Sequence, residues 1–355
     1  MLWYEDPVFR TAPFRDDPRT PEAEGRPAFR FTLHSHTRDG HPFEYGAIYD
    51  EIFALFEPIL RRDVTHVAMF TSKGTTPKRK AADKAGEWWR PFAFMREEFL
   101  GGADPKSDYS TWHWNGFDFL SGLEDAKAHK NSHRYLGPTK FCANFFRSIK
   151  IDATIPVADF EAGALDMKRL TELVTSLPVA TANMGFGISG FDSLIGASSS
   201  GYWLEIARRY PALDICTMRD RDQWWLEHKG DFTKYWLDGV TWITFVGRHF
   251  LDPLGGSAAL TSGLDPAITV TETENGLLFQ LGARPITGEA GADDALLPLY
   301  TALAARLRPL GNGCPSAENN WQRPFTDDPD SALNVEWARR FYDRENYSGN
   351  QGGTR

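Results

Sequence analysis

Hydrophobic and polar positions in the first part of the chain predict a strand, a helix and a second strand in succession. Residues 28–36 alternate as AFRFTLHSH, which is typical of a strand with one buried face. Over residues 45–62 the apolar side chains recur three and four positions apart, which predicts an amphipathic helix that Pro58 is expected to kink or shorten. Residues 64–71 (VTHVAMFT) predict the second strand. The chain is therefore expected to start as a β-α-β unit.

The middle of the chain is patterned less regularly. Residues 72–137 are polar and irregular, which indicates an insertion or a binding loop. Residues 138–158 contain at least one long strand pattern. Residues 165–177 predict a helix ended by a proline, and residues 178–184 predict a short strand.

Further elements are expected towards the C-terminus. Residues 201–210 have a helical pattern, and residues 239–247 read as a buried strand because they are β-branched and aromatic. Leucines at helical spacing over residues 296–307 predict another helix, with Asp293 or Asp294 as its cap.

The clearest local prediction is a β-hairpin over residues 268–281, which read ITVTETENGLLFQL. Two strand patterns flank Asn275 and Gly276, and an Asn-Gly pair supports the positive φ values of a two-residue type I′ turn. These elements predict an α+β fold with a mixed, largely antiparallel sheet and helices packed on it, as one unit or as two closely packed halves. The expected divisions are an irregular N-terminal arm (1–27), an N-terminal α+β half with a long inserted loop (28–160), a C-terminal α+β half (161–311) and a polar C-terminal extension (312–355).

Composition agrees with a folded chain that lacks covalent cross-links. Hydrophobic residues make up 41% of the 355 residues and charged residues 25%, which is ordinary for a globular protein. The three cysteines, Cys142, Cys216 and Cys314, are odd in number and far apart. A disulfide framework and a thiolate zinc site are therefore not expected.

The formal net charge of −9 suits a basic partner and argues against binding to nucleic acid or to an acidic membrane surface. The basic run at residues 73–84 is interpreted as a solvated loop. No basic region followed by an apolar run opens the chain, and no apolar stretch approaches the ~18 residues of a membrane-spanning helix. The protein is expected to stay in the cytoplasm where it is made.

A glycine motif after the strand pattern of residues 178–184 resembles a dinucleotide-binding sequence. Gly185, Gly187 and Gly190 form GxGxxG, but the following residues do not open a helix, and no second strand ends in an acidic residue about 20 positions on. Ser189 lacks the second glycine of a nucleophile elbow, because Phe191 stands there. The motif is therefore expected to be a flexible loop between strand and helix.

Two histidines suggest a metal site as an alternative. His34 and His36 can share one face of a strand, with His66, His113 or a distant carboxylate as a third ligand, but no HExxH spacing occurs. The favoured interpretation is a strand end with solvated histidines, so no metal or cofactor is expected. A metal-dependent enzyme that uses His34 and His36 stays open as an alternative function.

Aromatic and acidic residues in polar segments are the candidate binding residues. Trp is enriched among the residues that contribute most of the binding energy at protein interfaces, but for each tryptophan a position in the core is expected at least as often. The candidates for contact with a partner are Trp88, Trp89, Asp104, Asp108, Trp112, His113, Trp114, Trp224, Trp225, Asp327 and Asp328. No catalytic residue stands out, which favours a binding role.

The segment 201–310 resembles a family of type VI secretion immunity proteins whose partners are VRR-type nuclease effectors. The similarity lies in the order and spacing of several short motifs: Arg209, Tyr210, Pro211, Leu213 and Asp214; Gly239, Val240, Trp242, Thr244, Phe245 and Gly247; Leu254, Gly255 and Gly256; Gly276, Gly282, Pro285 and Gly288. Thr241, Ala212 and Glu289 depart from the family's usual Asn, Gly and Asp. These positions are expected to define the scaffold, with glycines at turns and Trp242 and Phe245 in the core.

The resemblance implies an immunity protein that is not an enzyme. It would bind a cognate toxin and neutralise it by stoichiometric occlusion, and the resemblance implies that the toxin is a nuclease. Recognition is expected in the variable loops of a rigid scaffold. An adaptor or chaperone that loads an effector onto the secretion machine is the other binding function that stays open.

Overall fold

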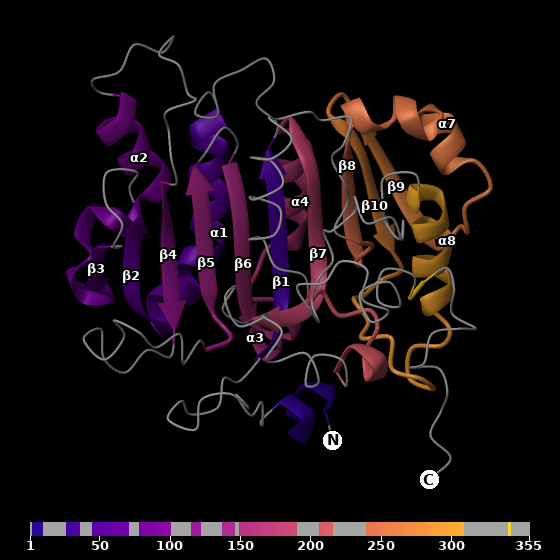
Figure 1. Cartoon of the computed structure of the whole chain (residues 1–355), viewed down its shortest axis with the longest axis horizontal. Coiled ribbons are helices and arrows are strands. Elements are labelled where there is room, and N and C mark those ends of the chain that lie inside the picture. Colours follow the sequence, from indigo (N-terminus) through magenta and orange to yellow (C-terminus); the bar gives the residue numbers. More distant parts are fainter. Residues whose placement is uncertain are drawn as a thin grey trace, which may run out of the picture.

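The computed structural model describes residues 2–9, 26–35, 45–70, 78–100, 115–121, 137–145, 149–189, 206–215, 239–308 and 340–341. The strands are β1 (Arg26–Ser35), β2 (Val64–Phe70), β3 (Lys78–Ala81), β4 (Asn115–Ser121), β5 (Lys140–Phe145), β6 (Ile149–Pro156), β7 (Val179–Ser189), β8 (Ile243–Gly247), β9 (Ile268–Thr273) and β10 (Gly276–Leu281). They form one ten-stranded sheet in the order β3-β2-β4-β5-β6-β1-β7-β8-β10-β9 (Figure 1).

Every neighbouring pair of these strands is antiparallel. The helices are α1 (Gly46–Asp63), α2 (Pro91–Leu100), α3 (Val157–Glu161), α4 (Met167–Thr175), α7 (Gly256–Thr261) and α8 (Leu297–Leu307). The predicted α+β class with a largely antiparallel sheet is confirmed. Since β1 lies between β6 and β7, strands from both parts of the chain share one continuous sheet. The expected boundary near residue 160 stays a prediction.

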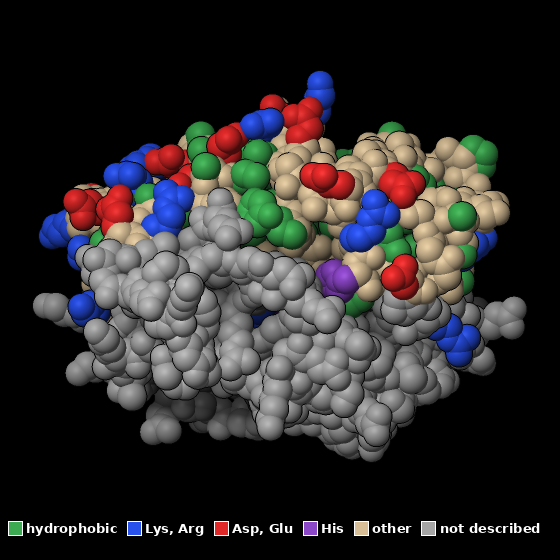
Figure 2. Space-filling view, turned by 90° about the horizontal axis from the view of Figure 1, so that it is seen from above, with side chains coloured by type: hydrophobic (Ala, Val, Ile, Leu, Met, Phe, Trp, Pro, Cys, Tyr) green, Lys and Arg blue, Asp and Glu red, His purple; other side chains and the backbone are tan. Residues whose placement is uncertain are grey.

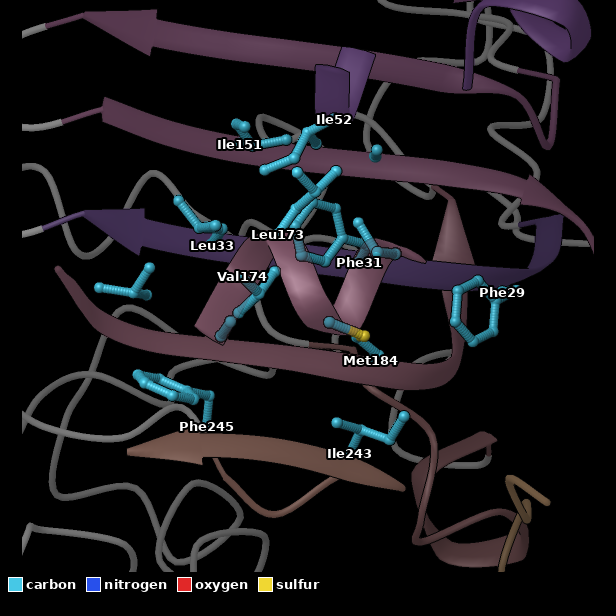
Figure 3. Close-up of a cluster of buried hydrophobic side chains, with 14 of the residues drawn as sticks. Phe29, Phe31, Leu33, Ile52, Ile151, Leu173, Val174, Met184, Ile243 and Phe245 are labelled. Carbon is cyan, nitrogen blue, oxygen red and sulfur yellow. The ribbon is translucent and has the colours of Figure 1, made fainter. Parts of the chain in front are cut away.

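One face of the sheet is apolar and packs against helices. Figure 3 shows Phe29, Phe31 and Leu33 of β1 in one buried cluster with Leu173 and Val174 of α4. Phe31 stacks on Phe56 of α1 with ring centroids 5.9 Å apart. Alternate residues of a strand point to opposite faces, so the apolar members of β1 define the side that the helices cover. We call it the helix-covered face.

The predicted β-α-β start is confirmed as a series of elements, but its two strands are not neighbours. Strands β4, β5 and β6 lie between β1 and β2 in the sheet, so the two run parallel at a distance. Helix α1 also continues through Pro58 to Asp63, so the expected shortening is wrong. Phe56 and Ile59 on either side of Pro58 are buried. Packing of this apolar face offsets the hydrogen bond that the proline removes.

The prediction that residues 72–137 form an irregular segment is wrong for much of it. Strand β3, the 3₁₀ turns η4 (Ala82–Lys84) and η5 (Gly86–Trp89), helix α2 and strand β4 lie there. Strand β3 reads KRKA and has no apolar pattern, so only its pairing with β2 makes it a strand. Phe117 and Phe119 of β4 do alternate, and both are buried.

The glycine motif is part of a strand rather than a flexible loop, so that expectation is wrong for residues 185–189. Strand β7 runs to Ser189 and pairs with β1 along its length. A Cβ on Gly187 would lie 2.6 Å from the carbonyl oxygen of Asp214, which forms an isolated bridge with Gly187. The glycine is therefore required for close approach of another backbone segment. Gly190 lies outside the described residues.

The predicted hairpin is confirmed with its turn shifted by one residue. Thr273 pairs with Gly276, so Glu274 and Asn275 form the turn and Gly276 opens β10. A Cβ on Gly276 would meet the carbonyl oxygen of Val246 at 2.2 Å. The glycine thus allows β10 to approach β8 closely.

Other predicted elements are confirmed with changed bounds. The helix expected at 165–177 is α4, and the strand expected at 239–247 is the shorter β8. Residues 206–209 are helical. The expected aspartate cap of α8 is wrong, because Leu296 is the N-cap residue. Asp293 instead accepts hydrogen bonds from the backbone of Thr287 and Gly288.

The N-terminal residues pack against a second, smaller core. The 3₁₀ turns η1 (Trp3–Glu5) and η2 (Pro7–Phe9) place Phe9 against Tyr210, with ring centroids 5.4 Å apart. The hydroxyl of Tyr210 donates to Asp6 at 2.7 Å.

Within the described part of the chain, no helix is long and apolar enough to cross a membrane.

Candidate functional site

The face of the sheet opposite the helix-covered face is polar across its central strands. Strand register places one row of side chains straight across six strands: Asp118, Cys142, Asp152, Thr32, Asn183 and Thr244. The neighbouring rows add Lys140, Thr154 and Arg30 on one side, and Asn144, Lys150, His34 and Thr181 on the other. We call this set of residues the polar face.

Two cations converge on one carboxylate in the middle of the polar face. Arg30 donates from Nε and Nη2 to the two carboxylate oxygens of Asp152, at 2.9 and 3.0 Å. The Nζ of Lys140 lies 2.7 Å from Oδ2 of Asp152. Arg30 also donates to Asp214 at 3.2 Å. All four side chains are buried, so they hold one another in a fixed arrangement of charges.

The surroundings of Asp152 keep it ionised. Burial by itself raises the pKa of Asp152, but the charges and hydrogen bonds of Arg30 and Lys140 outweigh burial and hold that pKa well below its usual range. A carboxylate held this way is a poor general base, since a base needs a pKa close to the working pH. The cluster can therefore stabilise a conformation but is unsuited to proton transfer.

Ser189, the serine of the glycine motif, has structural partners. Its hydroxyl donates to the carbonyl oxygen of Gly137 and accepts from the hydroxyl of Thr154, both at 3.1 Å. Neither partner is a base that could activate a nucleophile. Ser189 thus connects β7 to β6 and to the chain that enters β5.

The structure gives no support to the histidine metal site in the part of the chain it describes. His34 is 2% exposed on the polar face, and His66 is 9% exposed on β2, which three other strands separate from β1. Among the described residues no group of three metal-ligating side chains comes together. The expected solvated position of His34 is wrong, because its side chain and its cross-strand neighbours Lys150 and Thr181 are buried. His36 and His113 lie outside the described residues.

Two of the candidate partner-binding residues lie in the core. Trp88 and Trp89 belong to the turn η5 and are 5% and 7% exposed. Their rings contact Phe117 and Phe119 of β4, with centroids 6.0 and 5.2 Å apart. The indole of Trp89 donates to the carbonyl oxygen of Ala82 at 2.9 Å. Of the two interpretations for these tryptophans, the structure shows the core position.

The remaining candidates lie outside the described residues: Asp104, Asp108, Trp112, His113, Trp114, Trp224, Trp225, Asp327 and Asp328. Their proposed contact with a partner therefore stays a prediction from the sequence.

The outer surface of the helices carries charges that neutralise one another. Arg61 pairs with Glu57 on α1, Arg62 pairs with Asp159, and Arg169 pairs with Glu51. On the side of the molecule that Figure 2 shows, acidic and basic side chains of the described residues are intermingled. These charges therefore offset one another locally.

The buried charges of the polar face were missed by sequence reasoning. Asp152 stands in the strand pattern IKIDATI, and Lys140 stands next to the apolar run FCANFF. A charged residue at every second position of an otherwise apolar strand indicates a face with ion pairs, since buried charges need partners. Arg30 and Asp152 both stand in such strand patterns, but the sequence does not indicate that they form an ion pair with each other.

The motifs that carry the family resemblance form part of the scaffold. Gly288 has a φ of +80°, and a Cβ there would lie 2.9 Å from Pro211 and 3.0 Å from the backbone nitrogen of Ala212. That nitrogen donates to the carbonyl oxygen of Thr287 at 2.8 Å. Two motifs some 75 residues apart thus meet in space. Trp242 and Phe245 are buried, as expected.

Comparisons with known proteins agree with this scaffold. The sequence profile of the TsiV family, described as type VI immunity for VRR-NUC, matches residues 117–341, which is more than half of the chain. No curated protein matches the chain. Among solved structures, Pseudomonas aeruginosa T6SS protein PA0821 superposes with a TM-score of 0.62 and 17% sequence identity, over 91% of this chain and 87% of that one.

At this low identity the superposition shows a shared fold, and the family profile carries the assignment. The profile begins in β4, so the match reaches well upstream of the motifs recognised between residues 201 and 310. The chain belongs to the TsiV family of type VI immunity proteins for VRR-NUC effectors.

Proposed function

We propose that this immunity protein neutralises a VRR-NUC effector by forming a stoichiometric complex that blocks the effector's active site or its access to DNA. The single observation that carries the proposal is the match of the immunity family over residues 117–341. The buried ion cluster fits a binding scaffold, because Asp152 is held by two cations and is unsuited to proton transfer. Binding rather than chemistry is therefore the proposed mode of protection.

The charge of the chain supports a nuclease partner. The formal net charge is −9, with 48 acidic and 39 basic residues. A nuclease that binds DNA needs a positively charged cleft, because it must displace the counterions of the phosphates. An acidic inhibitor is attracted to the same cleft and competes with DNA for it.

The proposed place of action is the cytoplasm. A nuclease effector damages DNA there, so its inhibitor has to be present in the same compartment. Survival of cells that retain the effector in the cytoplasm is therefore the appropriate biological readout.

The experiment is co-expression with the VRR-NUC effector, followed by titration of the purified proteins. We expect survival only when both are made, co-purification at a fixed ratio, and nuclease activity that falls linearly to zero at one equivalent. Retained nuclease activity in a stable complex would favour an adaptor or chaperone. Inhibition at far less than one equivalent would mean enzymatic inactivation of the effector, and absence of both binding and protection would refute the immunity mechanism.

A further inference from the structure

The two edges of the sheet differ in their chemistry. Strand β3 forms one edge and exposes Lys78, Arg79 and Lys80 in succession. Strand β9 forms the other edge, is two residues longer, and contains neither lysine, arginine nor proline. Short strands and lysines prevent the association of sheet edges, so β3 has the features of a protected edge and β9 lacks them.

Hairpin register determines which backbone groups of β9 face outward. Thr273 and Gly276 flank a two-residue turn and are a hydrogen-bonded pair. In an antiparallel pair, hydrogen-bonded and non-hydrogen-bonded positions alternate along each strand, so Thr271 and Thr269 also bond to β10. The hydrogen bond from Gly282 N to Ala267 O, 3.1 Å long, continues this pattern. The N–H and C=O groups of Val270 and Glu272 therefore point away from β10, towards the free edge.

Side chains along β9 leave this edge open. Thr269, Thr271 and Glu272 are exposed, and the Glu272 side chain retains 55% of its accessible surface. In Figure 1, β9 is the outermost strand beyond β10. Among the described residues no strand pairs with its outer side. An extended segment can therefore add to β9 without displacing any described strand.

Charge selects a basic segment for this edge. Glu272 lies in the strand and Glu274 in the adjoining turn, and both are exposed. The Nη1 atom of Arg248 lies 3.8 Å from Oε1 of Glu272, so Arg248 offsets part of the negative charge of the two glutamates. The opposite edge, with its three cations, would repel the same basic segment.

We propose that the outer edge of β9 receives an extended, basic segment of the VRR-NUC effector as an additional antiparallel or parallel strand. The inference rests on the proposed function, which supplies a partner whose DNA-binding surface is basic. Backbone hydrogen bonds to Val270 and Glu272 hold the segment, and Glu272 and Glu274 select its charge.

Two substitutions of Glu272 separate the contribution of its backbone N–H to effector binding from that of its side chain. Glu272→Pro removes an N–H that faces outward, so it spares the ladder with β10, and proline is tolerated on edge strands. Glu272→Ala removes the same side chain and keeps the N–H. We expect the dissociation constant for the effector to rise about tenfold more for Glu272→Pro than for Glu272→Ala. Calorimetric titration with the effector measures both.

Hydrogen exchange on the full-length wild-type complex gives a second readout that needs no variant. We expect the amides of Val270 and Glu272 to gain protection when the effector binds, while those of Lys78–Ala81 on the other edge do not. Thermal unfolding of the two variants without effector checks that both remain folded.

The possible outcomes separate this proposal from the proposed function. Equal affinities of Glu272→Pro and Glu272→Ala, with unchanged exchange at Val270 and Glu272 in a tight wild-type complex, would refute the β9 site and leave the immunity mechanism intact. A wild-type protein that binds no effector would refute the immunity mechanism itself. A dimer of the free protein that Glu272→Pro dissociates would assign the edge to a second copy of this chain and overturn the proposal.

Discussion

A cluster of four buried charges in and beside the polar face is the main feature at the scale of single residues. Arg30, Lys140, Asp152 and Asp214 come from strands β1, β5 and β6 and from the segment that bridges to β7. Burial of charges is costly unless each has a partner, and these residues are all partnered. The cluster therefore makes the register of the central strands specific, because a shift by one residue would leave the charges unpaired on the apolar face.

Removal of the central carboxylate tests this role. Asp152→Asn leaves Arg30 and Lys140 buried without their shared anion, so we expect the free energy of unfolding to fall by about 3–5 kcal/mol. Urea denaturation at neutral pH measures the change. As a control, Glu57→Gln breaks the exposed pair with Arg61 and should cost less than about 1 kcal/mol. Equal effects of the two substitutions would contradict the role of the buried cluster.

The pH dependence of the free energy of unfolding should reveal the lowered pKa of Asp152. The folded pKa of Asp152 is lower than its unfolded value of about 3.9, so the unfolded state binds the proton more tightly. The stability that this group contributes is complete above that unfolded value and is lost as the pH falls towards the folded pKa. Below pH ~4 the wild type should therefore lose stability more steeply than Asp152→Asn. Parallel curves for the two proteins would contradict a depressed pKa.

At the scale of elements, the turn η5 shows how a pair of tryptophans serves the core. Trp88 and Trp89 pack against β4, and each ring also carries a cation on its outer side. Lys80 lies 4.0 Å from the Trp88 ring and Arg61 lies 4.4 Å from the Trp89 ring. The cations cover ring surface that would otherwise face solvent, which adds a cation–π contribution to burial.

Substitution in this turn separates a role in the core from a role in binding. Trp88→Ala removes a large buried ring, so we expect a loss of about 3–5 kcal/mol in the free energy of unfolding. Lys80→Ala removes only the covering cation and should cost about 1 kcal/mol or less. Effector affinity of folded Trp88→Ala should be unchanged. Weaker binding at unchanged stability would instead place Trp88 in the interface.

Elements with a strong internal pattern were predicted well from the sequence, and those formed by tertiary pairing were not. Helices α1 and α4 carry apolar residues at helical spacing, and in the hairpin β9 alternates while β10 is largely apolar. Strand β3 has no such pattern. Strand β7 was expected to end at residue 184, yet pairing with β1 extends it through two glycines to Ser189.

At the scale of the whole molecule, electrostatic attraction should govern how fast the effector is captured. The net charge is −9, whereas described ion pairs on the helices neutralise one another locally. Long-range attraction between oppositely charged proteins raises the association rate and is screened by salt. We expect the association rate constant to fall about tenfold between low and high salt, with a smaller change in the dissociation rate constant. Stopped-flow mixing measures both, and a salt-independent association rate would contradict electrostatic steering.

The sequence by itself determined the α+β class, the principal helices, the hairpin and the family, because these depend on periodicity and on the order of short motifs. Only the tertiary structure decided the strand order, the burial of Trp88 and Trp89, and the meeting of Arg30, Lys140, Asp152 and Asp214. The physical reason is distance along the chain. Contacts such as Arg30 with Asp152 join residues more than a hundred positions apart, and no local pattern contains the strand pairing that brings them together.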